Sequence, residues 1–151
     1  MEDYPEVSLR HYAFMMEGLQ EVASQLSERK IKFVLEKGSP EKVAVKYTKD
    51  AALVVCDRGY LRHQKQWRKH VAEKSPVKVV QLECDLVVPA ETVFDKEKYA
   101  ARTIRSKIHE HWKNFRQKVS IQKPGKRSLS LSFKGEDMDK ATEWLADMNI
   151  A

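Results

Sequence analysis

The alternation of short apolar runs with helical segments is the feature of this sequence that most constrains its fold. The apolar runs span residues 31–35, 51–56 and 77–82. Each run is too short for a stable helix and is rich in strand-forming residues, which predicts buried β-strands. Strands that alternate with helices at this spacing form βαβ units, and such units require a parallel sheet covered by helices. The sequence therefore predicts an α/β fold.

Two helices are predicted in the connections between these runs. The first has Ser39 as its N-cap and Pro40 at its first position, and it ends near Tyr47. The second ends near Lys74, because the residue before Pro76 is disfavoured in the helical conformation. Its shared apolar face consists of Leu61, Gln64, Trp67 and Val71. Both connections are thus long enough for a crossover between parallel strands.

Further elements are predicted before and after this alternation. A first helix, ending near Lys30, presents the stripe Tyr12, Met15, Leu19, Val22 and Leu26. A long helix over residues 95–118, capped by Asp95, presents Ala100, Ala101, Ile104, Ile108, Trp112 and Phe115. In residues 128–133 apolar side chains alternate with serine, which predicts either a strand that fills the sheet or an exposed linker strand. The last short helix carries Met138, Ala141, Leu145 and Met148. We therefore expect an α/β domain over residues 1–118 and a linker with a short strand and helix over residues 119–151.

The charge and cysteine content narrow the functional classes. The chain has 28 Lys and Arg against 22 Asp and Glu, a net charge of +6, which suits a polyanionic partner or an acidic neighbouring domain. Its two cysteines, Cys56 and Cys84, are too few for a disulfide scaffold and lack zinc-ligand spacing, so both are predicted to be buried free thiols. Neither a leader sequence nor a membrane-length apolar stretch is evident, which predicts a cytoplasmic protein. No catalytic or metal-binding constellation is predicted.

Two stretches carry a resemblance to a known family. They read VVCDRGYLRHQKQWR, residues 54–68, and DKEKYAARTIRSKI, residues 95–108. In this order they resemble the bacterial class II cyclobutane pyrimidine dimer DNA photolyases, flavoproteins that use light to split pyrimidine dimers. The likeness is collinear from Leu9 to the C-terminus.

The resemblance implies both a fold and a function. The family domain has a doubly wound, Rossmann-like parallel sheet of five strands, of which two would precede the present N-terminus, so the sheet would be incomplete there. The intact enzyme would use FAD, held by a large helical domain that begins about where this chain stops. It would act on damaged DNA and would have no membrane partner. This chain would supply the domain for a light-harvesting antenna chromophore, often a deazaflavin. Alone, it is expected to bind no flavin and to repair no dimers.

The polar turn after the second predicted strand is the candidate chromophore site. In open parallel sheets, ligands bind beyond the carboxyl ends of the strands. The resemblance places this turn, which comprises Asp57, Arg58, Gly59 and Tyr60, in part of the antenna pocket. Tyr60 would supply a stacking face, Asp57 a hydrogen-bond acceptor and Gly59 room for close approach. In the alternative interpretation, Asp57 caps the next helix and Tyr60 packs against that helix.

Two basic helices have other possible roles. The one after this turn is dense in cations, namely Arg58, Arg62, Lys65, Arg68, Lys69 and Lys74, which suits either a solvated or interdomain face or contact with phosphates. An alternative function is therefore a stand-alone nucleic-acid-binding module, and another is an inactive truncated photolyase. The later helix places Arg102, Arg105, His109, Lys113 and Arg116 on one stripe. We expect Arg102 and Arg105 to act at a boundary with the flavin domain.

Overall fold

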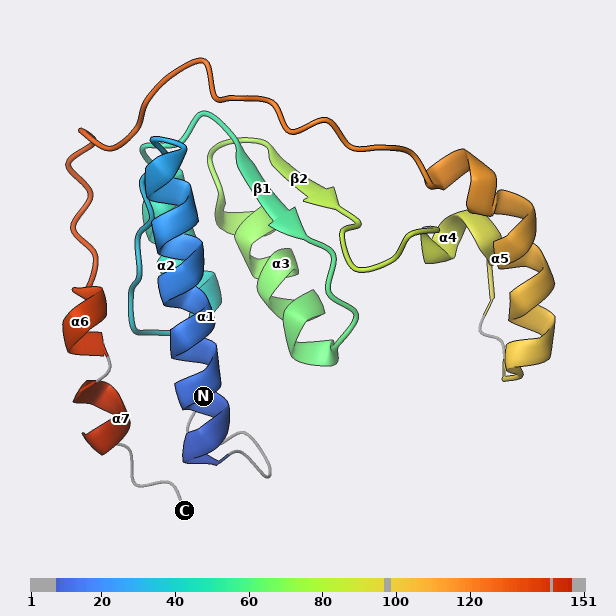
Figure 1. The fold of residues 1–151 in the computed structure, drawn as a ribbon, viewed down its shortest axis with the longest axis horizontal. Helices are drawn as coiled ribbons and strands as arrows, with labels where there is room; N and C mark the ends of the chain where they lie inside the picture. Colours follow the sequence, from blue (N-terminus) through green and yellow to red (C-terminus); the bar gives the residue numbers. More distant parts are fainter. Residues whose placement is uncertain (1–7, 97–98, 142, 148–151) are drawn as a thin grey trace. The chain divides into compact units, whose positions relative to one another are not determined.

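The computed structural model describes residues 8–96, 99–141 and 143–147 (Figure 1). The chain divides into two compact units. Unit 1 combines Met1–Lys37 with Ile121–Ala151, and unit 2 is Gly38–Ser120. Among the described residues, no helix combines the length and apolar character needed to cross a membrane.

Unit 2 contains the predicted parallel βαβ arrangement. Strands β1 (Val54–Asp57) and β2 (Val79–Leu82) pair in parallel, with Val54 opposite Val79. Helix α3 (Arg62–Lys74) connects the two strands, and α2 (Pro40–Thr48) packs against α3 (Figure 1). The α/β fold class is therefore confirmed.

The boundaries of α2 and α3 follow the serine and proline signals in the sequence. Ser39 is the N-cap residue of α2 and Pro40 its first residue, as expected from the proline's fixed φ. Helix α3 ends at Lys74, and Ser75 is already in an extended conformation before Pro76. The most buried side chains of these helices are Thr48 and Val71, at 1% and 7% exposure. These two predicted helices are confirmed nearly to the residue.

The small sheet is less covered than the apolar runs suggested. Along β1 half-buried and exposed residues alternate, and Val55 is 54% exposed. Cys56 is half-buried, with its Sγ 3.7 Å from the Val80 carbonyl oxygen, while Cys84 is exposed. The prediction of buried thiols was thus wrong: the small sheet covers Cys56 only in part, and Cys84 lies beyond the end of β2. An alternating pattern is typical of a sheet with one covered face.

In unit 1, the inward face of helix α1 (Leu9–Glu28) includes Tyr12, Leu19 and Leu26 of the predicted stripe but not Met15 and Val22. Tyr12 and Met16 are its buried residues, whereas Met15 and Val22 are 43% and 45% exposed. The inward positions are 12, 16, 19, 23 and 26, which follow the 3.6-residue period of one helical face. Because apolar residues also flank this face, the predicted stripe with Met15 and Val22 has the same three- and four-residue spacing in the sequence.

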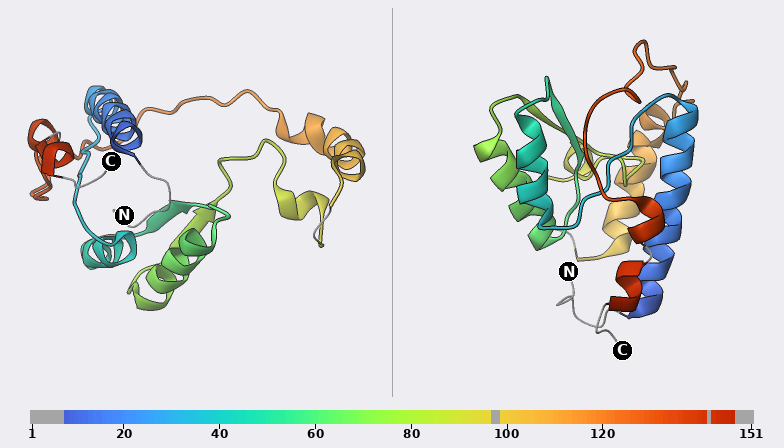
Figure 2. Two further views of the ribbon diagram at one scale, coloured as in Figure 1. Left: turned by 90° about the horizontal axis from the view of Figure 1, so that it is seen from below. Right: turned by 90° about the vertical axis from the view of Figure 1, so that its left-hand side faces the viewer.

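The C-terminal helices of unit 1 are short. Helices α6 (Met138–Ala141) and α7 (Glu143–Asp147) follow one another, and α7 lies beside α1 (Figures 1 and 2). They occupy the region where one short helix was predicted. Met148, assigned to the same apolar face, lies outside the described residues.

The predicted strands over residues 31–35 and 128–133 do not form. Isolated hydrogen bonds nevertheless join the ends of these segments or their neighbours: the amide of Ser128 donates to the Lys30 carbonyl at 2.9 Å, and that of Glu136 to the Leu35 carbonyl at 2.7 Å. A turn closed by a 3.1 Å bond from the Leu131 amide to the Ser128 carbonyl separates these contacts. A strand ladder needs regularly spaced bonds, and the turn interrupts them. The expectation of strands here was therefore wrong.

The long helix predicted over residues 95–118 is shorter and begins later. Helix α5 spans Ala101–Phe115 with Ala100 as its N-cap residue, so the prediction that Asp95 caps it was wrong. A separate helical turn, α4 (Ala90–Val93), precedes it and packs against it. Although α5 is strongly amphipathic, it contains no buried residue, and Trp112 remains 39% exposed.

Candidate functional site

The loop after β1 lies at the carboxyl edge of the small sheet. The Arg58 amide donates to the Leu82 carbonyl at 2.9 Å, so the pairing of the two strands continues into the loop. Because β1 and β2 are parallel, the residues that follow Leu82 lie at the same edge. This edge therefore brings together two polar turns, one after each strand.

Arg58 is held by a carboxylate of helix α4. Its guanidinium donates through both terminal nitrogens to the two oxygens of Glu91, with Nη1 and Oε2 separated by 2.8 Å. The hydrogen bond and the positive charge of Arg58 lower the pKa of Glu91, and the same bond raises the pKa of Arg58. A two-pronged arginine–carboxylate pair fixes orientation more strictly than a single contact does. Arg58 thus joins the loop to α4.

Tyr60 contacts the residue that follows β2. Its hydroxyl donates to Oε2 of Glu83, and this bond, then desolvation, then the negative charge of Glu83, raise the pKa of the phenol. The other oxygen of Glu83 is buried and has no hydrogen-bond partner among the described residues. Buried polar atoms are normally paired. The turn after β2 therefore carries one acceptor that the described residues leave unsatisfied.

Asp57 faces the same turn after β2. Its carboxylate accepts a hydrogen bond from the Cys84 thiol, which is the main cause of the raised pKa of Cys84, followed by desolvation and the charge of Asp57. A thiol with a raised pKa is a poor nucleophile, since the reactive species is the thiolate. Cys84 is therefore a polar contact of the loop and not a reactive group.

A hollow of about 300 Å³ opens beside these contacts. Its lining residues are Asp57, Gly59, Gln64, Trp67, Arg68 and Asp85. Arg68 joins α3 to the loop and to β2, since its Nη1 donates to the Gly59 carbonyl at 2.7 Å and its Nε to Gln81 Oε1 at 3.1 Å. Trp67 packs edge-on against His63, with 4.8 Å between ring centroids. The hollow thus combines an aromatic wall with two carboxylates and a fixed guanidinium.

The four predicted site residues divide into two pairs. Asp57 and Gly59 line the hollow, whereas Arg58 and Tyr60 are engaged with Glu91 and Glu83. The alternative in which Asp57 caps the following helix is wrong, because Asp57 is the last residue of β1 and Leu61 is the N-cap residue of α3.

Sequence reasoning missed several residues of this region. Asp85 and Glu83 belong to the polar turn after the third predicted strand, which the parallel topology places beside the first turn, so the sequence did contain a signal for them. Trp67 was assigned to the apolar face of its helix, and Arg68 to the basic one. Glu91 lies on a helix that was not predicted, and no sequence signal marked it.

The basic residues near α3 are partly committed to contacts within unit 2. Arg58 binds Glu91, Arg68 binds Gly59 and Gln81, and Lys69 lies 3.8 Å from Glu73. A cation that already pairs with a carboxylate must lose this contact to bind a phosphate. The geometry therefore disfavours the use of Arg58 and Arg68 for nucleic acid.

Helix α5 presents a second hollow of unit 2, with a volume of about 380 Å³. It is lined by Arg102, Arg105, Ser106 and His109. Both arginines are exposed, and neither forms an ion pair within the part of the chain that the structure describes. The two predicted boundary residues thus share one side of α5 with His109.

The βαβ unit and the hollow at its edge define a class of protein. A parallel βαβ unit whose polar turns surround a hollow at the carboxyl edge is typical of ligand-binding α/β domains. The family model described as DNA photolyase matches residues 2–125. The chain therefore belongs to the DNA photolyase family, which confirms the resemblance drawn from the sequence.

Two relatives of this family extend the comparison. The deoxyribodipyrimidine photo-lyase of Methanothermobacter thermautotrophicus is 40% identical over 149 residues, which are 99% of this chain and 34% of the relative. That of Potorous tridactylus is 38% identical over 112 residues, or 72% of this chain and 21% of the relative. The chain thus spans about a third of the length of the first relative and about a fifth of the second.

Proposed function

We propose that this chain supplies the antenna-chromophore domain of a class II cyclobutane pyrimidine dimer photolyase. Family membership supports this role. The main structural support is the hollow at the carboxyl edge of the sheet. In this proposal, FAD and the pyrimidine dimer itself are bound by the rest of such an enzyme. The chain alone then repairs no dimers.

The residues around the hollow fit a planar aromatic chromophore such as a deazaflavin. Trp67 offers an apolar face, Asp57 and Asp85 offer acceptors, and Arg68 offers a donor. A volume of about 300 Å³ lies at the lower end of the range for small-molecule sites, which is roughly 300–1,000 Å³. When bound, the chromophore would absorb light and pass its excitation energy to the flavin. The protein's task is to hold it in one orientation.

Arg58 and Tyr60 support the site in this proposal through the elements that they join. The Arg58–Glu91 pair links the loop to α4, and the Tyr60–Glu83 bond links the two turns. Loss of Tyr60 would therefore disturb the hollow although its ring does not line it.

A titration of the purified chain with 8-hydroxy-5-deazaflavin tests this proposal. We expect saturable quenching of the chromophore's fluorescence and a shift of its visible absorbance. The Trp67→Leu and Asp57→Asn variants should bind at least tenfold more weakly, whereas the Lys46→Gln control on α2 should bind as the wild type does. Equal binding by wild type, Trp67→Leu and Asp57→Asn would remove the hollow from the chromophore site.

We further propose that Arg102 and Arg105 face the flavin domain of the enzyme. Both guanidinium groups lack a carboxylate partner among the described residues, and no residue of α5 is fully buried there, although α4 packs against it. Arginine suits carboxylates and carbonyls of a neighbouring domain because its planar fork binds them through two donors. In a full-length photolyase that carries this segment, Arg102→Ala with Arg105→Ala should lower the melting temperature. An unchanged melting temperature with a salt slope reduced by about two would assign both arginines to DNA instead.

A further inference from the structure

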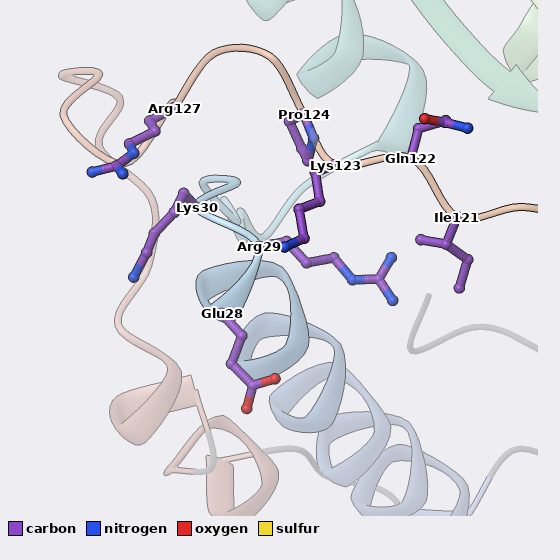
Figure 3. A pocket seen from close by; sticks show the side chains of 8 residues that line it. All are labelled: Glu28, Arg29, Lys30, Ile121, Gln122, Lys123, Pro124 and Arg127. Atoms are coloured by element: carbon purple, nitrogen blue, oxygen red, sulfur yellow. The ribbon is translucent and has the colours of Figure 1, made fainter.

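A basic hollow lies in unit 1, where α1 ends and residues 121–127 pass beside it (Figure 3). Its volume is about 430 Å³. Four of its lining residues are cations, Arg29, Lys30, Lys123 and Arg127, against the single acid Glu28. The segment that provides Lys123 and Arg127 is far from α1 in the sequence, so the fold itself gathers these charges. We refer to these four residues as the basic hollow.

The four cations of the basic hollow have no carboxylate partners. Within the described part of the chain, none of them forms an ion pair, although Glu28 lines the same hollow. All four residues are exposed. Like charges gathered without partners repel each other, and a bound anion removes this repulsion. The basic hollow is therefore available to a ligand in a way that Arg58, with its carboxylate partner, is not.

Lys30 adds a second, independent observation. Its φ of +62° is left-handed, and it is the one non-glycine residue with positive φ in the described part of the chain. The backbone ends α1 in a Schellman motif, with bonds from the Lys30 amide to Ser27 and from the Ile31 amide to Leu26, each 2.9 Å. Glycine is strongly preferred at this position, because side chains are strained in the left-handed region. The protein thus keeps a lysine side chain at the hollow at a conformational cost.

The dipole of α1 accounts for only part of this cluster. Cations near a helix C-terminus interact favourably with its partial negative charge, which is a sufficient reason for Arg29 and Lys30. Lys123 and Arg127 belong to a segment without regular secondary structure, and no helix of their own requires them. Their position beside α1 needs another explanation.

We propose that the basic hollow binds the phosphate backbone of a nucleic acid without regard to its sequence. In Figure 3, Arg29, Lys30 and Arg127 point in different directions, so they suit a row of phosphates and not one enclosed anion. Flexible, exposed Lys and Arg side chains are the groups that neutralise phosphates in sequence-independent binding. This surface deepens the proposed photolyase role, since it holds DNA outside the lesion. It does not depend on the chromophore site, which lies in unit 2.

The test is a salt series with an undamaged, fluorescently labelled 20-base-pair duplex. Binding to the full 151-residue chain is measured by anisotropy, so neither repair nor lesion recognition enters. The variant Arg29→Gln, Lys30→Gln, Lys123→Gln, Arg127→Gln should lose at least tenfold in affinity at low salt. The slope of log K against log salt should fall by about three to four, as loss of four phosphate contacts requires.

A matched variant removes four cations of α3 and so has the same net charge as the basic-hollow variant. It carries Arg62→Gln, Lys65→Gln, Lys69→Gln and Lys74→Gln, and it should lower the slope by less than about one. Equal losses in both variants would mean that net charge alone governs binding, and the proposal would be wrong. Wild-type affinity in the basic-hollow variant, with unchanged circular dichroism, would also overturn it.

Two further measurements separate a binding role from a structural one. Lys30→Gly should raise the midpoint of urea unfolding while it weakens duplex binding about two- to fivefold. A Lys30→Gly chain that binds the duplex as tightly as the wild type would limit Lys30 to helix termination and would contradict its place in the site. Pyrophosphate should compete only weakly; competition at micromolar concentration would indicate an enclosed anion site instead.

Discussion

The loop after β1 and the basic hollow of unit 1 use similar residues in opposite ways. Around the loop, Arg58 binds a carboxylate, and Arg68 of α3 binds a carbonyl and a side-chain amide. In the basic hollow, four cations have no such partner among the described residues. Paired charges fix a local structure, whereas unpaired charges remain available to a partner from outside. The positive charge of the chain therefore does not mark one binding surface: Arg58 and Arg68 are engaged within unit 2, whereas the basic hollow gathers four cations that lack partners among the described residues.

Gly135 and Lys30 differ in whether local structure favours the residue that is present. Gly135 has a local structural reason, because a Cβ there would lie 2.8 Å from the Leu35 carbonyl oxygen. Lys30 has the reverse situation, since its backbone favours glycine and yet it carries a long charged side chain. A residue that local structure disfavours is a better indicator of function than one that it requires.

The largest effect on folding is expected for Arg68→Ala. The change removes both hydrogen bonds of the guanidinium, to Gly59 and Gln81, and leaves the partly buried Gly59 carbonyl without this donor. A loss of about 2 kcal/mol in the free energy of unfolding is expected. Urea denaturation measures it, with Arg62→Ala as the control, which should change stability by less than about 0.5 kcal/mol. If Arg68→Ala instead keeps its stability and weakens duplex binding, Arg68 belongs with the unpaired cations.

A smaller effect, of opposite sign, is expected for Lys30→Gly. Relief of the left-handed backbone should stabilise the chain by about 1 kcal/mol. Lys49→Gly is the matched control: Lys49 ends α2 with a right-handed φ of −64°, so glycine there should destabilise by about 0.5–1 kcal/mol. Destabilisation by both changes would show that Lys30 is not strained, and would remove one support of the basic hollow.

Acid pH should weaken the Arg58–Glu91 pair. The pKa of Glu91 in the folded chain lies below its ordinary value of 4.5 because Arg58 binds the carboxylate. The stabilisation is therefore complete above pH 4.5 and is lost as the pH falls through the lower, folded pKa. The stability difference between wild type and Glu91→Gln should shrink across this range, and also at high salt. A difference that stays constant from pH 6 to pH 3 would contradict the pairing.

The smallest effect on stability is expected at alkaline pH, where ionisation of Tyr60 removes its hydrogen bond to Glu83. Its folded pKa is raised above the ordinary value of 10.0, chiefly by the bond to Glu83. Its contribution is therefore complete below pH 10 and is lost as the pH rises through the folded pKa. Ultraviolet titration at 295 nm should show one phenol that ionises late, and Tyr60→Phe should remove it. If the late phenol persists in Tyr60→Phe, the Tyr60–Glu83 bond is not its cause.

Local signals in the sequence predicted helices α2 and α3 well. Ser39 with Pro40, and Ser75 with Pro76, mark helix ends through backbone geometry that hardly depends on the rest of the fold. The parallel pairing of β1 and β2 followed from the length of the connection between them. The apolar runs were less reliable, because a run such as residues 31–35 is equally suited to an extended segment with isolated hydrogen bonds.

The site was only partly predictable, since it depends on contacts between distant residues. The position of Asp57 and Gly59 at the carboxyl edge followed from the strand pattern. That Glu91 engages Arg58 and Glu83 engages Tyr60 could not follow, because these pairs join segments 33 and 23 residues apart. The basic hollow was missed for the same reason: α1 and residues 121–127 contribute cations that look unremarkable in each segment alone.

A crossed titration tests most directly whether the two regions have separate roles. The wild type, the Trp67→Leu variant and the four-residue basic-hollow variant are each titrated with 8-hydroxy-5-deazaflavin and with the undamaged duplex. We expect Trp67→Leu to weaken only deazaflavin binding and the basic-hollow variant to weaken only duplex binding, each at least tenfold. If either variant weakens both ligands equally, or if each affects the other's ligand, the division into a chromophore site and a phosphate-binding surface is wrong.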